Sequence, residues 1–530
     1  MKVIVADKIS ERGVKLLKEQ REWKILQTTK ETLRTEISDA DALIVRSATK
    51  VTAELLEKAG KLRVVGRAGV GVDNIDLEAA TKRGVLVMST PGGNAVSVAE
   101  HTFALMLALA RQVPRLDKAI HEGRWEKSSA AGTEVRGKTL GLIGLGRIGS
   151  EVAVRADGFD MRVLGYDPFI SEAAAQELNV ELVALDTLLA ESDFISLHTA
   201  LSPATENLIN AESIAKMKSG ARIINAARGE LIDEAALAAA LESGKLAGAA
   251  VDVFREEPPP KNSPLMGLSN VIGTPHVAGS TAEAQEEVGT QVAVQVRDYL
   301  SEGIIRNAVN LPAISPDQYR RVRPYLDLAQ RLGSMVSQLA SSRPARIRIR
   351  YAGEAAEVGT HLLRSAVLAG VLNSVLEEKV NVVNAPAVAA ARGLRVEEET
   401  RRREHGFANT LEVAVLTGAS GEAGVVVEGT VLVDGTPRVL QIDGISVEAQ
   451  LEGTILYLTN RDEPGVVGQV GSTLGKLGVN IATFALGRRE AHRGSDAVAL
   501  VRLDGEVAES VAEAMRGIRA ITAAKLLRLG

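Results

Sequence analysis

The sequence predicts an α/β protein: two lobes built on doubly wound, Rossmann-like parallel sheets, followed by an α+β domain and a ferredoxin-like tail. Over the first part of the chain, short β-branched runs alternate with helix-like segments, which is the pattern of βαβ units around buried parallel strands. After Leu311-Pro312 the pattern changes to alternating strands and hairpin signals. The segment from Thr454 to Leu529 has the order βαββαβ, the ferredoxin-like signature.

The two lobes are predicted from the positions of strands and of two long helices. The expected strands are Lys2–Ala6, Ala42–Val45, Arg63–Gly66, Val85–Met88, Thr139–Ile143, Arg162–Tyr166, Phe194–Leu197, Arg222–Asn225, Ala249–Val253 and Val271–Gly273. One sheet rarely takes so many strands. Helical patterns over Asn94–Arg111 and Thr281–Leu300 would carry the chain into and out of the second lobe. We therefore expect 1–95 with 285–312 to form one lobe and 96–284 the other, with ligands in the cleft between them.

The rest of the chain divides into an expected antiparallel α+β domain, 313–452, and the tail, 453–530. Arg343–Tyr351 alternates, with Arg346, Arg348 and Arg350 on one face of a half-buried strand. Gly424–Val433 and Arg438–Ile442 flank a hairpin turn. The tail elements are expected at Thr454–Thr459, Gly465–Leu477, Asn480–Leu486, Ala497–Leu503, Val507–Arg516 and Ala523–Leu529.

Composition excludes several classes of site. The 530 residues include no cysteine, which excludes disulfides, iron–sulfur clusters, thiolate zinc sites and cysteine nucleophiles. The net charge of −5 argues against non-specific nucleic-acid binding. The longest apolar run, Phe103–Ala110, is far shorter than the ~20 residues of a membrane-spanning helix, and the start of the chain lacks a signal-peptide core. We expect a cytoplasmic protein with neither a nucleic-acid nor a membrane partner.

A dinucleotide-binding motif follows the strand Thr139–Ile143. It reads Gly144-Leu145-Gly146-Arg147-Ile148-Gly149 and opens a helix, and Asp167 ends the next strand. Gly144 would permit the tight turn, Gly146 the approach of a pyrophosphate and Gly149 close helix packing, while Asp167 would bind ribose hydroxyls and repel a 2′-phosphate. The alternative is a plain glycine-rich turn. The context favours a site for NAD over NADP.

Three polar residues follow later strands of the same lobe. Arg228, Glu257 and His276 all lie beyond carboxyl ends of parallel strands, where doubly wound folds bind ligands. His276 can be the base for an alcohol proton, Glu257 can hold it, and Arg228 can bind a carboxylate or developing carbonyl. For each residue alone, the simpler interpretation is an ordinary loop residue. Because all three are expected at the same edge of the sheet, the set favours hydride-transfer chemistry. No paired spacing supports a metal site, and no role is assigned to the remaining histidines: His101, His121, His198, His361, His405 and His492.

Taken together, these motifs resemble those of the D-isomer-specific 2-hydroxyacid dehydrogenases, and among them the long-type D-3-phosphoglycerate dehydrogenases. The resemblance covers the whole chain and is carried by Val45–Thr49, Gly66–Asn74, Gly144–Gly149, Asn225–Gly229, Asp252–Pro258 and Pro275–Thr281. It implies a catalytic Arg228, Glu257 and His276. It also implies cofactor contacts at Val70, Gly144, Gly146, Arg147, Ile148, Gly149, Asp167, Thr199, Ala226, Ala227, Arg228, Asp252, His276, Ala278 and Gly279.

The resemblance further implies NAD-dependent oxidation of 3-phospho-D-glycerate to 3-phosphooxypyruvate, the first step of serine synthesis from that intermediate. The implied substrate contacts are Arg46, Arg67, Val70, Gly71, Arg228 and His276, with the arginines on the phosphate and the amides on the carboxylate. Surface arginines are the simpler interpretation of Arg46 and Arg67 without the resemblance. Two other functions stay open: another D-2-hydroxyacid dehydrogenase, such as a hydroxypyruvate or glyoxylate reductase, and a non-catalytic NAD-sensing protein of the same fold.

The tail resembles an ACT regulatory domain through Asn460–Val467 and Gly478–Ile481. In the family, serine binds between two such domains of different subunits, which implies effector contacts at Asn460, Asp462 and Asn480 and a homodimer or homotetramer. Strongly serine-inhibited relatives have histidine at the position of Asn460, so a purely structural dimerisation domain is the alternative. The domain before it resembles an anion-binding intervening domain; the Arg346/Arg348/Arg350 face would be that site or, alternatively, a solvated strand face.

Overall fold

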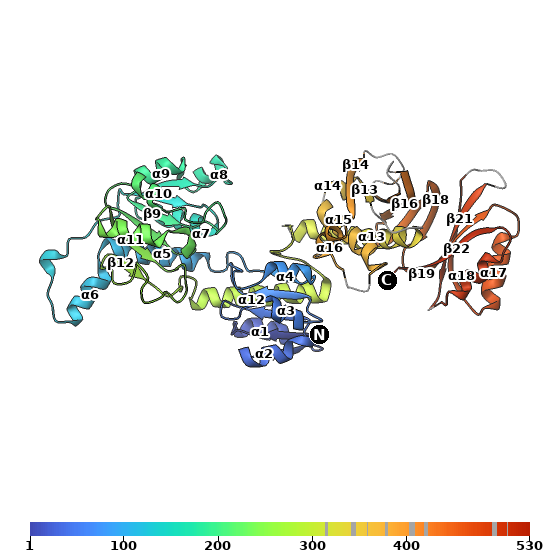
Figure 1. Ribbon diagram of the computed structural model, residues 1–530, viewed down its shortest axis with the longest axis horizontal. Helices are drawn as coiled ribbons and strands as arrows, with labels where there is room; N and C mark the ends of the chain where they lie inside the picture. Colours follow the sequence, from blue (N-terminus) through green and yellow to red (C-terminus); the bar gives the residue numbers. More distant parts are fainter. Residues whose placement is uncertain are drawn as a thin grey trace.

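The structure is a computed structural model that describes residues 1–312, 316–340, 346–357, 359–376, 380–401, 407, 409–417, 422–489, 495–505 and 507–529. These residues form four sheets, and the corresponding parts of the chain lie along the long axis of the molecule in Figure 1. The second lobe is at the left, the first lobe at the centre and the two tail parts at the right. The expected domain junction at 313 lies outside the described residues.

The first lobe is a five-stranded sheet of order β2-β1-β3-β4-β5, with every pair parallel. Its strands are β1 (Lys2–Val5), β2 (Lys24–Gln27), β3 (Ala42–Val45), β4 (Val64–Arg67) and β5 (Leu86–Met88). Its helices are α1 (Glu11–Lys18), α2 (Lys30–Glu36), η1 (Ile37–Asp39), α3 (Ala53–Lys58), α4 (Leu77–Lys82) and the returning α12 (Ala282–Glu302). The α12 helix packs on α1 so closely that a Cβ on Gly13 would lie 2.4 Å from the carbonyl oxygen of Gly289.

The second lobe is a seven-stranded parallel sheet of order β12-β11-β10-β9-β6-β7-β8. Its strands are β6 (Thr139–Ile143), β7 (Arg162–Tyr166), β8 (Val180–Leu182), β9 (Phe194–Leu197), β10 (Ala221–Asn225), β11 (Leu246–Val251) and β12 (Val271–Gly273). Its helices are α5 (Ala95–Ala110), α7 (Arg147–Asp157), α8 (Glu172–Glu177), α9 (Leu185–Glu191), α10 (Ala211–Lys216), η3 (Gly229–Leu231) and α11 (Glu234–Glu242). Aliphatic clusters fill both faces of this sheet, which confirms the doubly wound fold.

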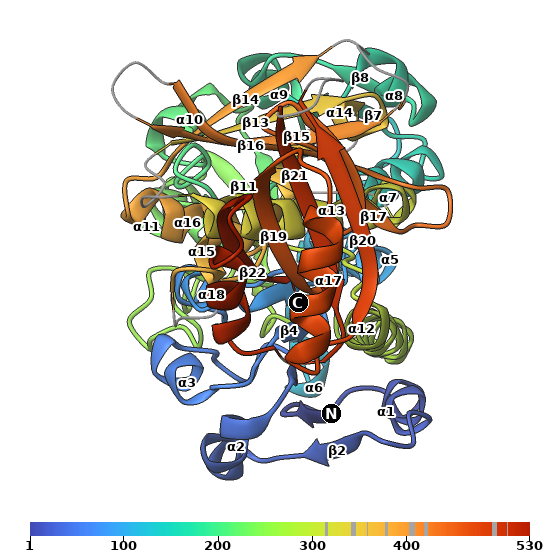
Figure 2. The same ribbon diagram turned by 90° about the vertical axis from the view of Figure 1, so that its right-hand side faces the viewer.

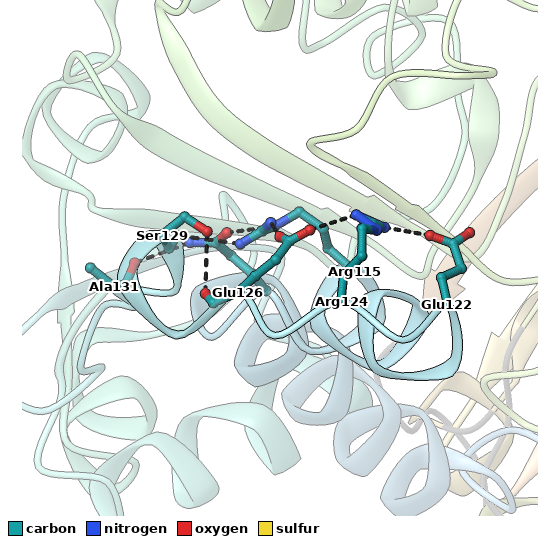
Figure 3. A network of polar contacts seen from close by, with 7 residues as sticks. Arg115, Glu122, Arg124, Glu126, Ser129 and Ala131 are labelled. Atoms are coloured by element: carbon teal, nitrogen blue, oxygen red, sulfur yellow. Dashed lines mark hydrogen bonds and ion pairs between the residues drawn. The ribbon is translucent and has the colours of Figure 1, made fainter.

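An arm projects from the second lobe at the far left of Figure 1. It consists of α6 (Val113–His121), η2 (Lys127–Ser129) and the segment between them. Arg124 bridges Glu122 and Glu126, and Arg115 binds Glu126 and the carbonyl of Ser129, as Figure 3 shows. These ion pairs fix the shape of the arm, which has few apolar contacts of its own.

The third sheet has the order β14-β13-β15-β16-β17-β18. Its strands are β13 (Arg346–Ala352), β14 (Arg395–Arg401), β15 (Thr410–Thr417), β16 (Glu422–Val431), β17 (Pro437–Ile442) and β18 (Ile445–Gln450). The helices are α13 (Pro316–Leu339), α14 (Glu354–Glu357), α15 (Thr360–Asn373) and α16 (Ala385–Ala391). The expectation of an antiparallel sheet was wrong in one place: β13 and β14 pair in parallel, because three helices cross between them. Residues 343–345 of the predicted strand lie outside the described part.

The tail has the predicted βαββαβ order and an antiparallel sheet, β20-β21-β19-β22. The elements are β19 (Gly453–Arg461), α17 (Val466–Lys476), β20 (Ile481–Arg488), β21 (Asp496–Leu503), α18 (Ser510–Arg516) and β22 (Ile521–Leu529). Figure 2 shows α17 in front of the sheet, while the other face joins the core of the preceding domain. In the described residues, no helix is both long enough and apolar enough to cross a membrane.

The three arginines of β13 each lie beside an acid of a neighbouring strand, and Nε of Arg348 is buried with no hydrogen-bond partner in the described residues. Their side chains are largely buried and paired with acids of neighbouring strands. Arg350 lies 2.6 Å from Glu399 and 3.0 Å from Glu412, while Arg348 lies 3.9 Å from Glu412. Arg346 lies 3.6 Å from Glu397. The face is thus a ladder of ion pairs between strands, which the alternation of residues within one strand could not reveal.

Candidate active site

The glycine-rich loop runs from the end of β6 into α7. Gly144 has φ of 96°, and a Cβ there would lie 2.7 Å from the carbonyl oxygen of His198. A Cβ on Gly149 would lie 2.1 Å from the carbonyl of Gly144, so both positions exclude a side chain. Gly146 caps α7 without a side-chain bond, and no described atom lies within 4 Å of its Cβ position. The N-terminus of α7 therefore has no side-chain cap and has open space at Gly146, which fits a pyrophosphate.

The carboxylate of Asp167 is held beside this loop. It follows β7 and accepts hydrogen bonds from the amide of Leu145, at 2.8 Å, and from the amide of Phe169, at 2.9 Å. These bonds fix the acid next to the mouth of the glycine loop, the position at which a ribose would lie. The residues present therefore fit NAD, whose adenosine ribose carries two free hydroxyls.

His198, to which no role was assigned, lies directly beneath the glycine loop. Its Nε2 is 2.8 Å from the hydroxyl of Ser196, and its buried Nδ1 has no partner in the described residues. Burial lowers the pKa of His198 from 6.5 to about 4, so the ring is neutral at physiological pH. Thr199, which follows it, lies against Gly144. The histidine is therefore a packing support for the loop rather than an acid or a base.

His276 and Glu257 form a hydrogen-bonded pair. The Nδ1 of His276 lies 2.8 Å from Oε2 of Glu257, and the amide of Phe254 donates to the other oxygen of Glu257 at 3.1 Å. The two side chains are 51% and 38% exposed, so the pair is open to solvent. Because Glu257 occupies Nδ1, the Nε2 of His276 is the nitrogen left to take a substrate proton.

The loop that carries His276 is tied to a buried carboxylate. Asp252, which is fully buried, accepts hydrogen bonds from Thr274 Oγ1 at 2.5 Å and from the amides of Val277 at 2.9 Å and Ala278 at 2.8 Å. His276 itself has φ of 52°, a left-handed conformation that is uncommon for residues other than glycine. The expected cofactor contact of Asp252 stays a prediction; the structure shows that its carboxylate holds the loop that carries His276.

Arg228 reaches from the second lobe to the first. Asn225, buried at the end of β10, bonds to the carbonyl of Arg228 and the amide of Ala227, which fixes the turn. Nη1 of Arg228 donates to the carbonyl of Ala227 at 2.6 Å, and Nη2 lies 2.9 Å from Asp73 of the first lobe. A Cβ on Gly71 would lie 2.1 Å from the same Nη2. The guanidinium thus rests on the loop that follows β4.

Two further arginines lie on the first lobe. Arg46 follows β3, where Asp7 accepts its amide hydrogen at 2.6 Å, and Arg67 ends β4 rather than following it. A Cβ on Gly69 would lie 1.4 Å from Nη1 of Arg67, so only glycine leaves room for that side chain. Burial first, then the charges of Arg228 and Arg46, lower the pKa of Arg67 to about 10. Arg67 therefore lies near Gly69 and within electrostatic range of Arg228, whose Nη2 lies against Gly71.

Two of the predicted effector residues, Asn460 and Asp462, line one small pocket of the tail, whereas Asn480 lies apart from them. Arg461, beside Asn460 and Asp462, pairs with Asp496, whereas Ile481, beside Asn480, pairs with Leu503. These are opposite ends of β21, about 20 Å apart at ~3.3 Å per residue. Asn460 is buried and bonds to the carbonyl of Arg461, and Asn480 bonds to Asp504 at 2.6 Å. A site that uses all three residues needs two chains.

The remaining histidines have separate positions. Nε2 of His101 lies 3.1 Å from Thr274 Oγ1 and 3.5 Å from Oδ1 of Asp252. His121 pairs with Asp117 at 3.5 Å, and burial lowers the pKa of His361. His405 and His492 lie outside the described residues. In the part of the chain that is described, no three His, Asp or Glu side chains are grouped to hold a metal ion.

Comparisons with known proteins give three family matches along the chain. Residues 103–278 match the NAD-binding domain of D-isomer specific 2-hydroxyacid dehydrogenases, 321–443 the intervening domain of D-3-phosphoglycerate dehydrogenase, and 454–520 the ACT domain. Among solved structures, a D-lactate dehydrogenase from Aquifex aeolicus, complexed with NAD and lactic acid, is similar with a TM-score of 0.52 and 33% identity. The match covers 59% of this chain and 100% of that one.

Two curated relatives match over nearly the whole length. The D-3-phosphoglycerate dehydrogenase of Methanocaldococcus jannaschii is 43% identical over 98% of this chain and 98% of its own. The D-3-phosphoglycerate dehydrogenase of Bacillus subtilis is 40% identical over 100% of this chain and 99% of its own. These matches include both lobes and both tail domains. The chain therefore belongs to the D-3-phosphoglycerate dehydrogenase family.

Proposed function

We propose that the chain catalyses the NAD-dependent oxidation of 3-phospho-D-glycerate to 3-phosphooxypyruvate, the opening step of L-serine synthesis. The observation that carries the proposal is that Arg67 of one lobe lies within electrostatic range of Arg46 and of Arg228 from the other lobe, while His276 of that other lobe is paired with Glu257. A substrate with a phosphate at one end and a carboxylate at the other needs such a set of cations. Full-length similarity to enzymes of that name supports the same substrate.

Each polar group has a distinct task in this mechanism. The amides of Val70 and Gly71 and the guanidinium of Arg228 hold the substrate carboxylate, and Arg46 with Arg67 holds the phosphate. Nε2 of His276 then accepts the proton of the 2-hydroxyl group, and Glu257 stabilises the imidazolium that results. Arg228 also stabilises the developing carbonyl oxygen. NAD, when bound along the glycine loop, supplies the hydride acceptor.

The role of Arg67 offers a test of the substrate. Arg67→Ala should weaken binding of 3-phosphoglycerate by roughly 1.5–3 kcal/mol, the value of a charged hydrogen bond, and should weaken D-glycerate binding much less. Steady-state KM and kcat for both substrates measure the difference. Lys61→Ala removes the same charge from an exposed position on the same lobe and should change neither. Equal losses with both substrates would make Arg67 structural and favour a dehydrogenase of unphosphorylated 2-hydroxy acids.

We further propose that the ACT domain binds serine between two chains. The side of β20 away from β21 has no ladder partner in the described residues, although β18 lies against it where Ser446 meets Gly487. Pairing of two such edges antiparallel would bring Asn480 of one chain toward Asp462 of the other. Serine should then lower activity partially, and Asn480→Ala should remove this response while turnover without serine stays unchanged. Calorimetry without a binding signal at millimolar serine would leave the domain with an assembly role only.

A further inference from the structure

Asp73 is a charged residue at the centre of the site that the mechanism above does not use. It lies on the loop after β4, and its Oδ2 is 2.9 Å from Nη2 of Arg228 on the opposite lobe. The side chain of Asp73 is 67% exposed and that of Arg228 is 29% exposed. A carboxylate of the first lobe is therefore paired with the guanidinium that the second lobe is expected to offer to the substrate.

The position of Asp73 overlaps with the expected position of the substrate carboxylate. Nη2 of Arg228 lies against Gly71, whose amide is one of the two expected to hold that carboxylate. Nη1 of Arg228 already donates to the carbonyl of Ala227 at 2.6 Å. Nη2 carries Asp73, so a substrate carboxylate at the same nitrogen would lie beside the carboxylate of Asp73, and two carboxylates side by side repel each other. Asp73 and the substrate compete for the same edge of Arg228.

The surrounding charges explain why a carboxylate is needed there. The positive charges of Arg228 and Arg46 disfavour the charged form of Arg67, and Asp73 and Asp7 oppose this effect. The carboxylate of Asp7 is held in place, since it accepts hydrogen bonds from the amides of Arg46 and Thr49 and from the Thr49 hydroxyl. Asp73 is well exposed, so it can move into water at little cost.

We propose that Asp73 is a displaceable counter-ion of the active site. It neutralises Arg228 while the site holds no substrate and yields the guanidinium to the substrate carboxylate. Asp73 therefore sets the affinity for substrate rather than the rate of the chemical step. The inference rests on the proposed function only in that the substrate carries a carboxylate beside Val70 and Gly71. If Asp73 instead orients Arg228 for catalysis, its loss would lower kcat.

The test compares Asp73→Asn with the wild-type enzyme. KM for 3-phosphoglycerate should fall roughly three- to tenfold, as expected from removing a partly exposed competing ion pair, with kcat within about twofold and KM for NAD unchanged. Asp73→Glu, which keeps the carboxylate, should retain the wild-type KM. Glu78→Gln removes the same charge from an exposed position on α4 and should leave KM and kcat as they are. Should the asparagine variant fail to fold, Asp73→Ala gives the same comparison.

Three results would overturn the proposal: an unchanged KM, a raised KM, or a kcat lowered by about tenfold or more, since the last would mean that Asp73 positions Arg228 for the chemical step. D-Lactate, which carries the carboxylate without the phosphate, is the second substrate. Its KM should fall in Asp73→Asn by a similar factor. A wild-type enzyme that oxidises D-lactate but not 3-phosphoglycerate would refute the proposed substrate, and the D-lactate comparison would still decide the role of Asp73.

Discussion

Replacing Asp252 by asparagine should release the loop that carries His276 while the rest of the second lobe stays folded. The aspartate is fully buried and gathers three donors: Thr274 Oγ1 and the amide of Val277 on Oδ1, and the amide of Ala278 on Oδ2. An asparagine of the same shape has only one acceptor atom. In either orientation, its NH2 group points at a donor that the carboxylate had satisfied.

The cost follows from this count of hydrogen bonds. The variant loses at least one charged hydrogen bond and leaves a buried N–H or O–H unpaired, which together are worth about 2–4 kcal/mol. Thr274→Val removes the hydroxyl donor alone and should cost about 1.5 kcal/mol. A loop that loses this much stabilising free energy no longer holds His276 in its left-handed conformation. A displacement of the base by about 1 Å should lower kcat by about 100-fold.

Hydrogen exchange of the peptide that spans Thr274 to Ser280 measures the release directly, and kcat measures its consequence. Asp252→Asn should accelerate exchange of the Val277 and Ala278 amides, with Thr274→Val intermediate. Asp160→Asn makes the same chemical change at an exposed position of the same lobe and should alter neither. Wild-type exchange together with wild-type kcat in Asp252→Asn would refute the anchoring role.

Three further predictions concern the cofactor and proton sites. His276→Ala should lower turnover by ~10²–10⁴-fold while NAD still binds, measured by initial rates and by titration; a near-wild-type rate would remove His276 from the mechanism. Asp167→Ala should narrow the preference for NAD over NADP by about tenfold or more, and an unchanged preference would contradict its contact with the ribose. Since the pKa of His198 falls from 6.5 to about 4 on folding, stability should be lost as pH drops through this window, by about 3 kcal/mol. His198→Gln should remove this loss in denaturant titrations at pH 7 and pH 4; equal losses in both proteins would show that His198 does not titrate in this way.

The sequence predicts the two lobes well, because in each the chemistry follows strands that are short and apolar. Arg46, Arg228 and His276 all lie within a few residues of a strand end, so the periodicity that predicts the strands also predicts the edge at which these residues gather. The glycine loop is predicted for the same reason, since it joins the end of β6 to the start of α7 and Gly149 packs on the backbone of Gly144 in the same loop. These features depend on contacts that are local in the sequence.

Contacts between distant segments could not be predicted in this way. Asp252 resembles a cofactor contact in the sequence, and only the fold of 274–278 around it reveals an anchor. The acid partners of Arg348 and Arg350 come from strands far along the chain. The separation of the predicted effector residues depends on how β21 pairs with β19 and β20, which places Asp462 and Asn480 at opposite ends of β21. The ion pair between Asp73 and Arg228 depends on how the two lobes are placed relative to each other, and no local sequence pattern specifies that placement.

The most direct measurement is the initial rate of NADH formation by the wild-type enzyme with 3-phospho-D-glycerate and, separately, with D-glycerate. The proposed phosphate contacts of Arg46 and Arg67 predict that kcat/KM for the phosphorylated substrate exceeds that for D-glycerate by about 100-fold or more, the equivalent of two charged hydrogen bonds to the phosphate. Equal kcat/KM values for the two substrates, or a preference for D-glycerate, would contradict the phosphate site and with it the proposed function.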